Sequence, residues 1–330
     1  MTLRDWLGVP AEALHDVYQQ ERRVWLQQLR WDTSAAWNEV ERARLAWGLP
    51  GFVATDRDGR IHGLTYYMIE DGRVDIGGLA SDAAWATDLL LDGILDAAHA
   101  AGATSVRGLL LDAAAALPSG LRLRKCAIHR HLYLAKDLNA TAPSPSRAAL
   151  LWAQVAATHT VSRGAAEAVR WCADDVHAAA ALLSRAYDQD AGRLFAPRGD
   201  IAGWRRYVNN LVRHVGCGTM NPAMTQVLHD GHEIIALALV SDIAPGVAHL
   251  VQLAVDPRRR GERLGDALVQ RACHGLRAAG YTALTLLVEE DNHAARAIYE
   301  RAGFRPDATF VALDGTLDVP HTRHCALASV

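Results

Sequence analysis

An arginine-rich loop that follows an apolar segment is the first feature of this sequence that could do chemistry. Residues 249–265 read HLVQLAVDPRRRGERLG, which is an apolar strand, Asp256-Pro257, an arginine cluster beside glycines, and the start of an amphipathic helix. The N–H groups of a first helical turn have no partner inside the helix, and the helix dipole favours negative charge there. The loop therefore predicts a phosphate or pyrophosphate site, with four side chains near enough to add charge-assisted hydrogen bonds: Arg258, Arg259, Arg260 and Arg263.

The elements that would position this loop follow from the hydrophobic periodicity of the second half of the chain. Strands are predicted at Val169–Trp171, Thr225–Leu228, Ile234–Val240 and Ala283–Val288, with Asp230-Gly231 as a hairpin turn. Helices are predicted at Asp175–Tyr187, Trp204–Val212, Leu264–Ala279 and Ala294–Ala302, before further strands at the C-terminus. The loop thus joins a buried strand to a helix.

The first half of the chain predicts a similar order of elements. A helical region at residues 11–47 precedes strands Gly51–Thr55, Ile61–Ile69 and Val74–Leu79, with Asp58-Gly59 as the first hairpin turn. Helix Asp88–Ala101 and strands Val106–Leu111 and Ile128–Leu134 follow. A segment rich in Pro, Ser and Ala then begins at Asn139 and has the composition of a linker. We predict an α/β fold, in the sense of an α+β mixed sheet, with domains at 1–140 and 166–330 and a linker at 141–165.

The matching order of elements indicates an internal repeat. Residues 100–104, AAGAT, match residues 278–282, AAGYT, and each segment ends a helix and opens an apolar strand. This alignment places residues 82–87, DAAWAT, opposite the loop residues 260–265, RGERLG. The first copy has no arginine or glycine there and begins with an acid, so we predict that it has lost the anion site. The alternative is two unrelated α/β domains that share common turn chemistry.

The composition predicts a folded, soluble protein. Of 330 residues, 50% are hydrophobic and 22% charged, and the formal net charge of −3 gives no indication of nucleic acid or membrane binding. The cysteines are odd in number and scattered, which favours structural thiols in a reducing compartment: Cys126, Cys172, Cys217, Cys273 and Cys325. The N-terminus lacks a signal-peptide pattern, and no apolar run approaches the ~20 residues of a membrane span, so we expect a cytoplasmic protein.

The second half resembles the GNAT superfamily of N-acetyltransferases. The resemblance rests on the end of the apolar strand, Leu253–Pro257, on the loop Arg260–Gly265, and on residues 292–304, NHAARAIYERAGF. It covers most of residues 168–315, whereas the first half shares only the order of elements. The resemblance implies two tandem acetyltransferase-like domains, the first of them degenerate. Each would be a mostly antiparallel sheet flanked by helices, with a splayed parallel strand pair.

The loop departs from the family pattern at one position. The family's phosphate loop reads Arg or Gln, two residues, Gly, one residue, and Gly or Ala. Arg260 and Gly265 match its two ends, but Arg263 stands where the middle glycine is usual. With Arg263 there, the loop needs a backbone conformation that a side chain tolerates.

The resemblance implies acetyl-CoA as the co-substrate and no metal. Acetyl-CoA would lie between strands 250–255 and 283–288, and its pantetheine arm would bond the backbone of Leu253, Ala254 and Val255. Beside Arg260, the pyrophosphate would lie on the N–H groups of Gly261, Glu262, Arg263, Leu264, Gly265 and Asp266. Asn292 would hold the cofactor arm, and Tyr299, seven residues later on the same helix face, would reach the thioester sulfur.

The implied reaction is direct attack of an amine on the thioester, which needs a base, an oxyanion donor and an acid. Tyr299 is the candidate acid, although an amphipathic aromatic residue can also serve only in packing. The backbone N–H of Leu253 or Val255 is the candidate oxyanion donor. Four side chains are candidate bases, and each could equally have no catalytic role: His249, with an ordinary pKa near ~6.5, Glu289 or Glu290 through an ordered water, and Asp242.

The expected function is acetyl-CoA-dependent N-acetylation of a primary amine of a small molecule in the second domain. Duplicated members of the superfamily with one working half include enzymes that resemble mycothiol synthase, and the layout here is similar, but no acceptor motif selects that substrate. The alternatives are a protein N-terminal or lysine acetyltransferase and a non-catalytic acyl-CoA sensor or scaffold. Residues 188–212 and parts of the first domain would line the acceptor pocket, in a monomer that forms an internal pseudo-dimer or in a homodimer.

Overall fold

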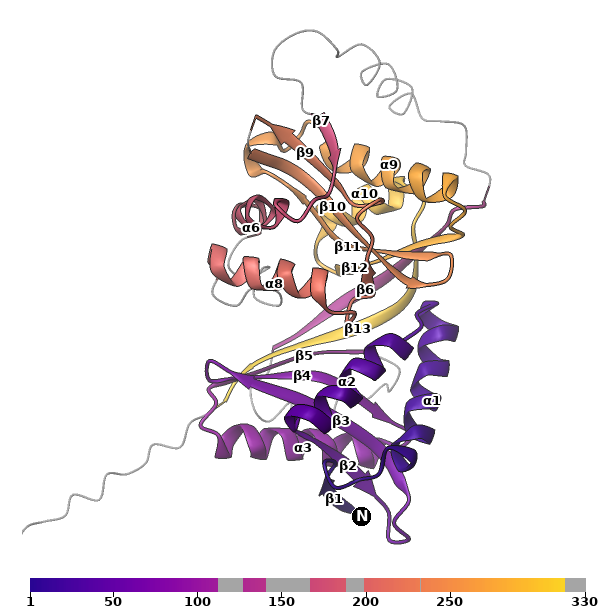
Figure 1. Cartoon of the computed structure of the whole chain (residues 1–330), viewed down its shortest axis with the longest axis vertical. Helices are drawn as coiled ribbons and strands as arrows, with labels where there is room; N and C mark the ends of the chain where they lie inside the picture. Colours follow the sequence, from indigo (N-terminus) through magenta and orange to yellow (C-terminus); the bar gives the residue numbers. More distant parts are fainter. Residues whose placement is uncertain (112–126, 141–166, 188–198, 232, 318–330) are drawn as a thin grey trace, which may run out of the picture. The chain divides into compact units, whose positions relative to one another are not determined.

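The computed structural model describes residues 1–111, 127–140, 167–187, 199–231 and 233–317 and divides into two compact units (Figure 1). Unit 1 consists of Met1–Glu21, Glu41–His129 and Val311–Val330, and unit 2 consists of Arg22–Val40 and Arg130–Phe310. Each unit contains a mixed sheet with one parallel strand pair, which confirms the predicted fold class. The predicted linker lies outside the described residues, so the domain boundaries stay a prediction.

Unit 1 is a sheet with the strand order β1-β2-β3-β4-β5. Its strands are β1 (Thr2–Asp5), β2 (Gly51–Thr55), β3 (Ile61–Glu70), β4 (Arg73–Ser81) and β5 (Ser105–Leu111). Helix α3 (Ala84–Ala100) packs on this sheet through Leu91, Ile94 and Leu95. All neighbours are antiparallel except β4 and β5, which run parallel from Arg73↔Ser105 to Ile76↔Gly108.

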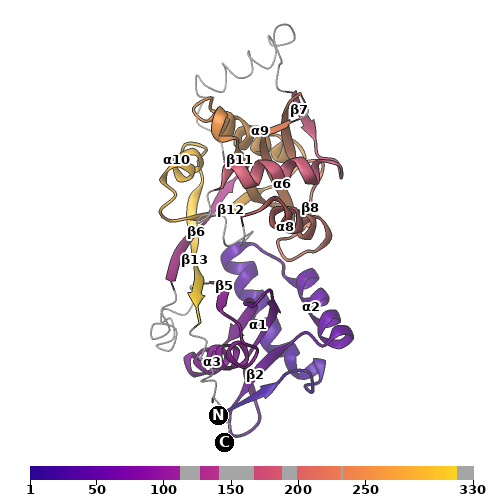
Figure 2. The ribbon, with the colours of Figure 1, turned by 90° about the vertical axis from the view of Figure 1, so that its left-hand side faces the viewer.

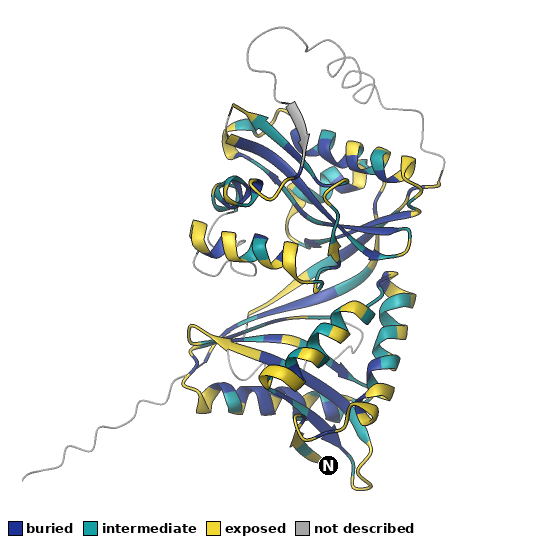
Figure 3. Cartoon of the chain, viewed as in Figure 1, coloured by how far each residue is buried: buried dark blue, intermediate teal, exposed yellow. Residues whose placement is uncertain are grey.

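Unit 2 is a sheet covered on both faces. Its strand order is β6-β12-β11-β10-β9-β7, with β8 paired to β10. The strands are β6 (Ala127–Asp137), β7 (Glu167–Arg170), β8 (Thr219–Met220), β9 (Gln226–Asp230), β10 (Glu233–Ala244), β11 (Val247–Val255) and β12 (Ala283–Glu289). Figure 3 shows β10 and β11 largely buried at the centre of this unit.

The helices of unit 2 divide between the two faces of its sheet. Helices α6 (Asp175–Ala186) and α8 (Ile201–Arg213) pack on one face through Leu183, Trp204 and Val208. Helices α9 (Leu264–Ala278) and α10 (His293–Arg301) pack on the other through Leu268 and Tyr299. Figure 2 shows α10 and α6 on opposite sides of the strands. A short 3-10 helix, η1 (Pro257–Arg259), joins β11 to the loop before α9.

The helical region at residues 11–47 is two helices, and the predicted continuous helical stretch is interrupted. Helix α1 (Ala11–Leu29) ends before Arg30, which has a φ of 56°, and α2 (Ser34–Trp47) begins after a short turn. The tip of this hairpin, Arg22–Val40, belongs to unit 2. There the Asp32 N–H donates to the Ile243 carbonyl at 2.8 Å, and the Tyr133 hydroxyl donates to the Leu29 carbonyl at 2.9 Å.

The two halves repeat down to individual hydrogen bonds, which supports the predicted duplication. The Thr104 N–H donates to the Gly72 carbonyl at 2.7 Å, and the Thr282 N–H donates to the Gly246 carbonyl at 2.8 Å. Both glycines have a positive φ in the turn before the first strand of the parallel pair, β4 in unit 1 and β11 in unit 2.

The last strand of each half belongs in part to the unit built by the other half: β6 for most of its length, and β13 (Arg305–Thr316) for half of its length. Strand β6 comes from the first half, yet it pairs with β12 of unit 2 from Asp137↔Ala283 to His131↔Glu289. Strand β13 comes from the second half, yet its residues from Val311 onward belong to unit 1. The hydrogen bonds that follow these two strands also correspond. The Leu138 N–H donates to the Thr282 carbonyl, and the Leu317 N–H donates to the Thr104 carbonyl, each at 2.8 Å. The halves have therefore exchanged strands.

Sequence reasoning missed two short strands and one helix start. Strand β1 has four residues, three of them exposed, and β8 has two, so neither carries a hydrophobic alternation. Helix α3 begins at Ala84, four residues before the predicted Asp88. Cys172, Cys217 and Cys273 are free, and no helix within the described ranges is long and apolar enough to cross a membrane.

The strand exchange predicts how fragments of the chain behave. A fragment of residues 166–330 lacks β6 and so exposes the edge of β12, whereas a fragment of residues 127–330 keeps that pairing. Because an unpaired apolar edge promotes aggregation, we expect the shorter fragment to elute as aggregate in size-exclusion chromatography and the longer one to give more soluble, cooperatively unfolding protein. Equal solubility and equal melting curves for the two fragments would contradict the exchange.

Candidate active site

Strand β11 parts from β12 halfway along its length. The two strands pair in parallel from Val247↔Ala283 to Leu250↔Leu286. Beyond that point β11 stays paired with β10, from Gln252↔Leu239 to Val255↔Ala236, and a bulge leaves Val251 out of the register. The edge of residues 251–255 on the β12 side is therefore not paired with β12. This is the geometry that the sequence predicted for Leu253, Ala254 and Val255.

A buried carboxylate fixes the end of β11. Asp256 has no exposed surface, accepts hydrogen bonds from the N–H and guanidinium of Arg258 at 2.9–3.0 Å, and accepts one from Arg185 of α6 at 3.0 Å. The hydrogen bonds from Arg258, followed by those from Arg185, hold the pKa of Asp256 well below its usual range. Asp256 thus stays charged and ties the loop to α6.

The helix N-terminus has the open backbone that an anion site requires. The first backbone bond of α9 runs from the Ala267 N–H to the Arg263 carbonyl at 3.1 Å, so the N–H groups of Leu264, Gly265 and Asp266 precede the helical ladder. Gly265 is buried, and a Cβ there would lie 3.1 Å from Cδ1 of Ile298. Glycine at this position therefore lets α9 begin close against α10.

Arg263 has a left-handed backbone, a conformation that side chains rarely adopt. Its φ of 59° and ψ of 23° are left-handed, as the usual glycine would allow without strain. Gly261, two residues earlier, has a φ of 87° and open space around it. The arginine therefore preserves the course of the loop at the cost of a strained backbone, and its exposed side chain points away from the core.

Two of the four predicted arginines are engaged within the loop and its neighbours. Arg258 also pairs with Glu233 at 2.8 Å, and Arg259 pairs with Asp230 at 2.8 Å and with Glu262 at 2.7 Å. Arg260 donates to the Ala186 carbonyl at 2.9 Å, and both Arg260 and Arg263 are exposed. The positive charge left for a phosphate is therefore mainly that of Arg260 and Arg263.

Asn292 and Tyr299 lie at the start and near the end of α10. Asn292 is the N-cap, and its side-chain oxygen accepts from the Ala295 N–H at 3.1 Å, which leaves its amide nitrogen as the donor for a ligand. Tyr299 is only 6% exposed and packs against Phe304, with ring centres 5.8 Å apart. Burial, with a smaller effect from Tyr187, raises the pKa of Tyr299. Its phenol therefore keeps its proton at neutral pH.

The structure places His249 where it is a poor base. The ring is buried, its Nδ1 lies 2.9 Å from the Thr285 hydroxyl, and Trp31 and Tyr133 pack on it. Burial lowers the pKa of His249 to about 3. An imidazole with such a pKa cannot hold the proton of an amine near neutral pH, so burial argues against the predicted role.

The two carboxylates at the end of β12 and directly after it, Glu289 and Glu290, are better exposed than His249. Glu289 ends the strand, is half-buried, and faces His131 of β6 in the register. By alternation it shares its sheet face with Thr285 and Leu287, whereas Leu284, Leu286 and Val288 face the core under α9. Glu290 lies 3.6 Å from Arg130. Glu289 therefore points to the α6 and α8 side of the sheet.

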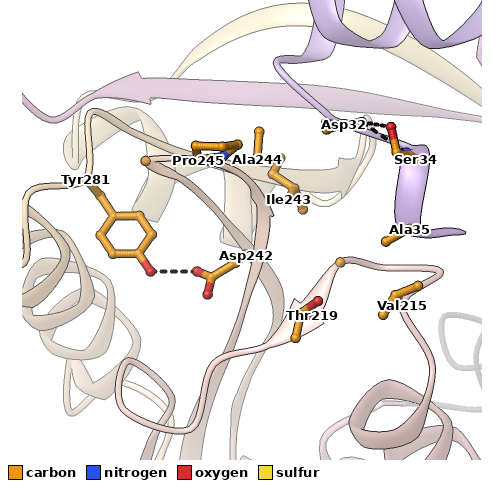
Figure 4. A pocket seen from close by; sticks show the side chains of 12 residues that line it. Asp32, Ser34, Ala35, Val215, Thr219, Asp242, Ile243, Ala244, Pro245 and Tyr281 are labelled. Atoms are coloured by element: carbon orange, nitrogen blue, oxygen red, sulfur yellow. Dashed lines mark hydrogen bonds between the residues drawn. The ribbon is translucent and has the colours of Figure 1, made fainter.

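Asp242 lies at the opposite end of β11 from the loop. It accepts from Tyr281 at 2.8 Å and from Asn221 at 3.0 Å. Figure 4 shows it on the wall of a cavity of about 390 Å³, which the β10–β11 turn shares with Asp32 and Ser34 of the helical hairpin tip. This cavity is separate from the part of β11 that leaves β12, which sets Asp242 apart from the other candidates.

A buried polar network beside the bulge escaped sequence reasoning. Tyr187, at the end of α6, donates to Oε1 of Gln252 at 2.6 Å, and Nε2 of Gln252 donates to Tyr207 of α8 at 2.7 Å. The spacing of these three residues along the sequence gives no signal for the network. Residues 188–198, part of the predicted acceptor segment, lie outside the described residues.

Comparison with known proteins finds a family match for part of the chain. Residues 183–304 match the model of the Acetyltransferase (GNAT) family. A protein of Beutenbergia cavernae called mycothiol acetyltransferase is 40% identical over 92 residues, which cover 27% of this chain and 30% of that protein. The chain thus matches less than a third of that relative's length.

Solved structures show the same fold over nearly the whole chain. A GCN5-related N-acetyltransferase from Sphaerobacter thermophilus superposes with a TM-score of 0.62 at 17% identity and covers 95% of each chain. A tandem GNAT protein from the clavulanic acid biosynthesis pathway superposes with a TM-score of 0.51 at 18% identity, over 81% of this chain and 82% of that one. These likenesses support two GNAT folds in tandem.

Unit 1 carries a carboxylate at the position that matches the predicted phosphate loop of unit 2. Asp82 follows β4 directly before α3, and the Nδ1 of His62 lies 2.9 Å from its Oδ1. The Nε2 of His62 lies 3.0 Å from Asp56, and Arg60 lies 3.9 Å from Asp82. The acid thus lies beside the helix start that a phosphate would need, as the sequence predicted for a degenerate copy.

The Asp56–His62–Asp82 bridge predicts a pH-dependent stability. Hydrogen bonds to Asp56 and then to Asp82 raise the pKa of His62 above its ordinary 6.5. The stabilisation is therefore fully present below pH 6.5 and is lost as the pH rises through the folded-state pKa. We expect His62→Gln to lower the melting temperature at about pH 6 and to have a smaller effect at about pH 9.

The matched control is His99→Gln, a change of an exposed histidine on α3 of the same unit. This variant should melt like the wild type at both pH values. A His62→Gln deficit that does not shrink with rising pH would show that the bridge does not depend on a charged imidazole.

Proposed function

We propose that the chain is an acetyl-CoA-dependent N-acetyltransferase that acts on a primary amine of a small molecule, with its site in unit 2. The observation that carries the proposal is the parting of β11 from β12 beside a glycine-containing helix N-terminus, within residues 183–304 of the GNAT match. Acetyl-CoA is the co-substrate of this family. An extended arm and a pyrophosphate are the two features that such a geometry can hold together.

The residues present fit acetyl-CoA. The backbone of Leu253, Ala254 and Val255 has left β12 and so offers hydrogen-bonding groups to an extended arm. The N–H groups of residues 261–266, which include Gly265 at the α9 start, would hold a pyrophosphate, with Arg260 and Arg263 adding charge. Asn292 would hold the arm through its free amide nitrogen.

Different side chains would carry out the two proton transfers of the reaction. When bound, the thioester supplies an activated acetyl group for the attacking amine. Tyr299 would deliver its proton to the departing thiolate, since its raised pKa keeps the phenol protonated. A backbone N–H near the β11 bulge, with Leu253 as the first candidate, would stabilise the developing oxyanion. Glu289 would accept the amine proton through a water.

The acceptor is proposed as a small molecule because of what the relatives are called. The Beutenbergia cavernae protein is named for mycothiol, and this chain shares 40% identity with it over the matched part. An amine related to mycothiol is therefore the first candidate acceptor.

The test measures free CoA release from acetyl-CoA with a panel of small amines, an N-terminal peptide and a lysine peptide. We expect release with a small amine, and a Tyr299→Phe variant with kcat lowered about 100-fold and the acetyl-CoA KM little changed, because the proton donor is lost. Tyr281→Phe is the matched control, since its hydroxyl binds Asp242 at the other end of β11.

Each outcome decides between the candidate functions. Release with a peptide alone favours a protein acetyltransferase, and binding of acetyl-CoA without any release favours a sensor. Equal turnover by Tyr299→Phe and the wild type would remove the proposed acid and leave the rest.

A further inference from the structure

Gln252 connects three elements of unit 2 through one side chain. Its amide oxygen accepts from Tyr187 at 2.6 Å, and its amide nitrogen donates to Tyr207 at 2.7 Å. Tyr187 is the residue directly after α6, and Tyr207 lies in α8. The amide therefore joins both helices to β11. Gln252 is 3% exposed. An amide is suited to this position because it accepts on one side and donates on the other.

The network lies where β11 leaves β12. Leu250 is the last β11 residue in register with β12, the bulge at Val251 follows, and Gln252 is the next residue. A bulge bends its strand and so changes the directions in which the following side chains point. A side chain anchored directly after it therefore fixes the course of the strand where the proposed oxyanion donor begins.

The aromatic rings around the amide are packed, which makes the arrangement rigid. The ring centres of Tyr187 and Trp204 are 5.2 Å apart. Those of Trp204 and Tyr207 are 5.7 Å apart, with the rings edge to face. Trp204 is itself 1% exposed. Burial raises the pKa of Tyr187 to about 12, so Tyr187 remains a hydrogen-bond donor to Gln252 at neutral pH.

We propose that Gln252 is a positioning residue for acetyl transfer, which ties α6 and α8 to β11 where that strand leaves β12. This inference rests on the proposed function. Gln252 itself touches neither the acetyl group nor the amine. It acts by fixing β11 through its hydrogen bonds to the two tyrosines.

The test compares Gln252→Met, Tyr187→Phe and the double variant in the full chain. Methionine keeps the length of glutamine but makes neither hydrogen bond. We expect Gln252→Met to lower kcat about tenfold or more, with the calorimetric Kd of acetyl-CoA within about twofold of wild type. The double variant should be no slower than the slower single variant, because both changes break one network.

Two further variants separate positioning from general stability. Gln226→Met makes the same change on β9, away from the parted strands, and should leave kcat unchanged. Gln252→Glu can replace the amide while its carboxyl is protonated, accepting from Tyr187 and donating to Tyr207. Its kcat should therefore fall as rising pH ionises the carboxyl, a dependence absent from the wild type.

The outcomes distinguish this inference from the proposed function. If the wild type releases CoA and Gln252→Met keeps kcat within twofold, the positioning role is wrong. If Gln252→Met fails to fold, Tyr187→Phe and Tyr207→Phe decide, since each removes only one hydroxyl, and unchanged kcat in both overturns the inference. A wild type that releases no CoA with any acceptor overturns the proposed function and, with it, the role assigned to Gln252.

Discussion

The chemistry proposed for unit 2 depends on β11 leaving β12 after Leu250 while it stays paired with β10. Backbone N–H and C=O groups that leave one neighbour need another partner, and an extended ligand arm can supply it. The separation is held from three directions. A bulge redirects the strand at Val251, the Gln252 amide ties it to α6 and α8, and the buried Asp256 fixes its end. The residues that hold the sheet open therefore lie directly beside the candidate site.

The two units share one arrangement, but the loop that we propose as the phosphate site lies in unit 2. Both units have a parallel pair preceded by a glycine turn, with matching hydrogen bonds at Thr104 and Thr282. Unit 1 closes its helix start with Asp82, which His62 holds. The first half of the chain nonetheless contributes to the fold of unit 2, because its strand β6 completes the sheet of that unit. A copy that no longer binds an anion can thus still be needed for the fold of the other copy.

The sequence predicted the elements well wherever periodicity or turn residues are strong. The predicted β2 matches its observed bounds, and α9 and β12 differ from theirs by one residue, because Gly280 and the apolar run after it mark those ends. The strand exchange was not predictable, since a strand's own residues do not say which edge it joins. The interruption at Arg30 was missed for a related reason, as a single left-handed residue breaks a helical pattern without changing its composition.

The candidate site was predictable in its backbone parts and less so in its side chains. The loop, Asn292 and Tyr299 are local motifs, whereas the left-handed backbone of Arg263 was not predicted. The burial of His249 depends on Trp31, far away in sequence, and the Gln252 network depends on two helices. Such long-range contacts are invisible to spacing along one strand.

Calorimetric titration of the full chain with acetyl-CoA tests the central claim most directly. The account predicts one molecule bound per chain, with affinity weakened about tenfold or more by Arg263→Glu, which places a negative charge at the loop. The same reversal at Arg57→Glu, in an exposed turn of unit 1, should leave the affinity unchanged. Two molecules bound per chain, or equal affinity in the wild type and Arg263→Glu, would contradict the assignment of acetyl-CoA to the loop of unit 2.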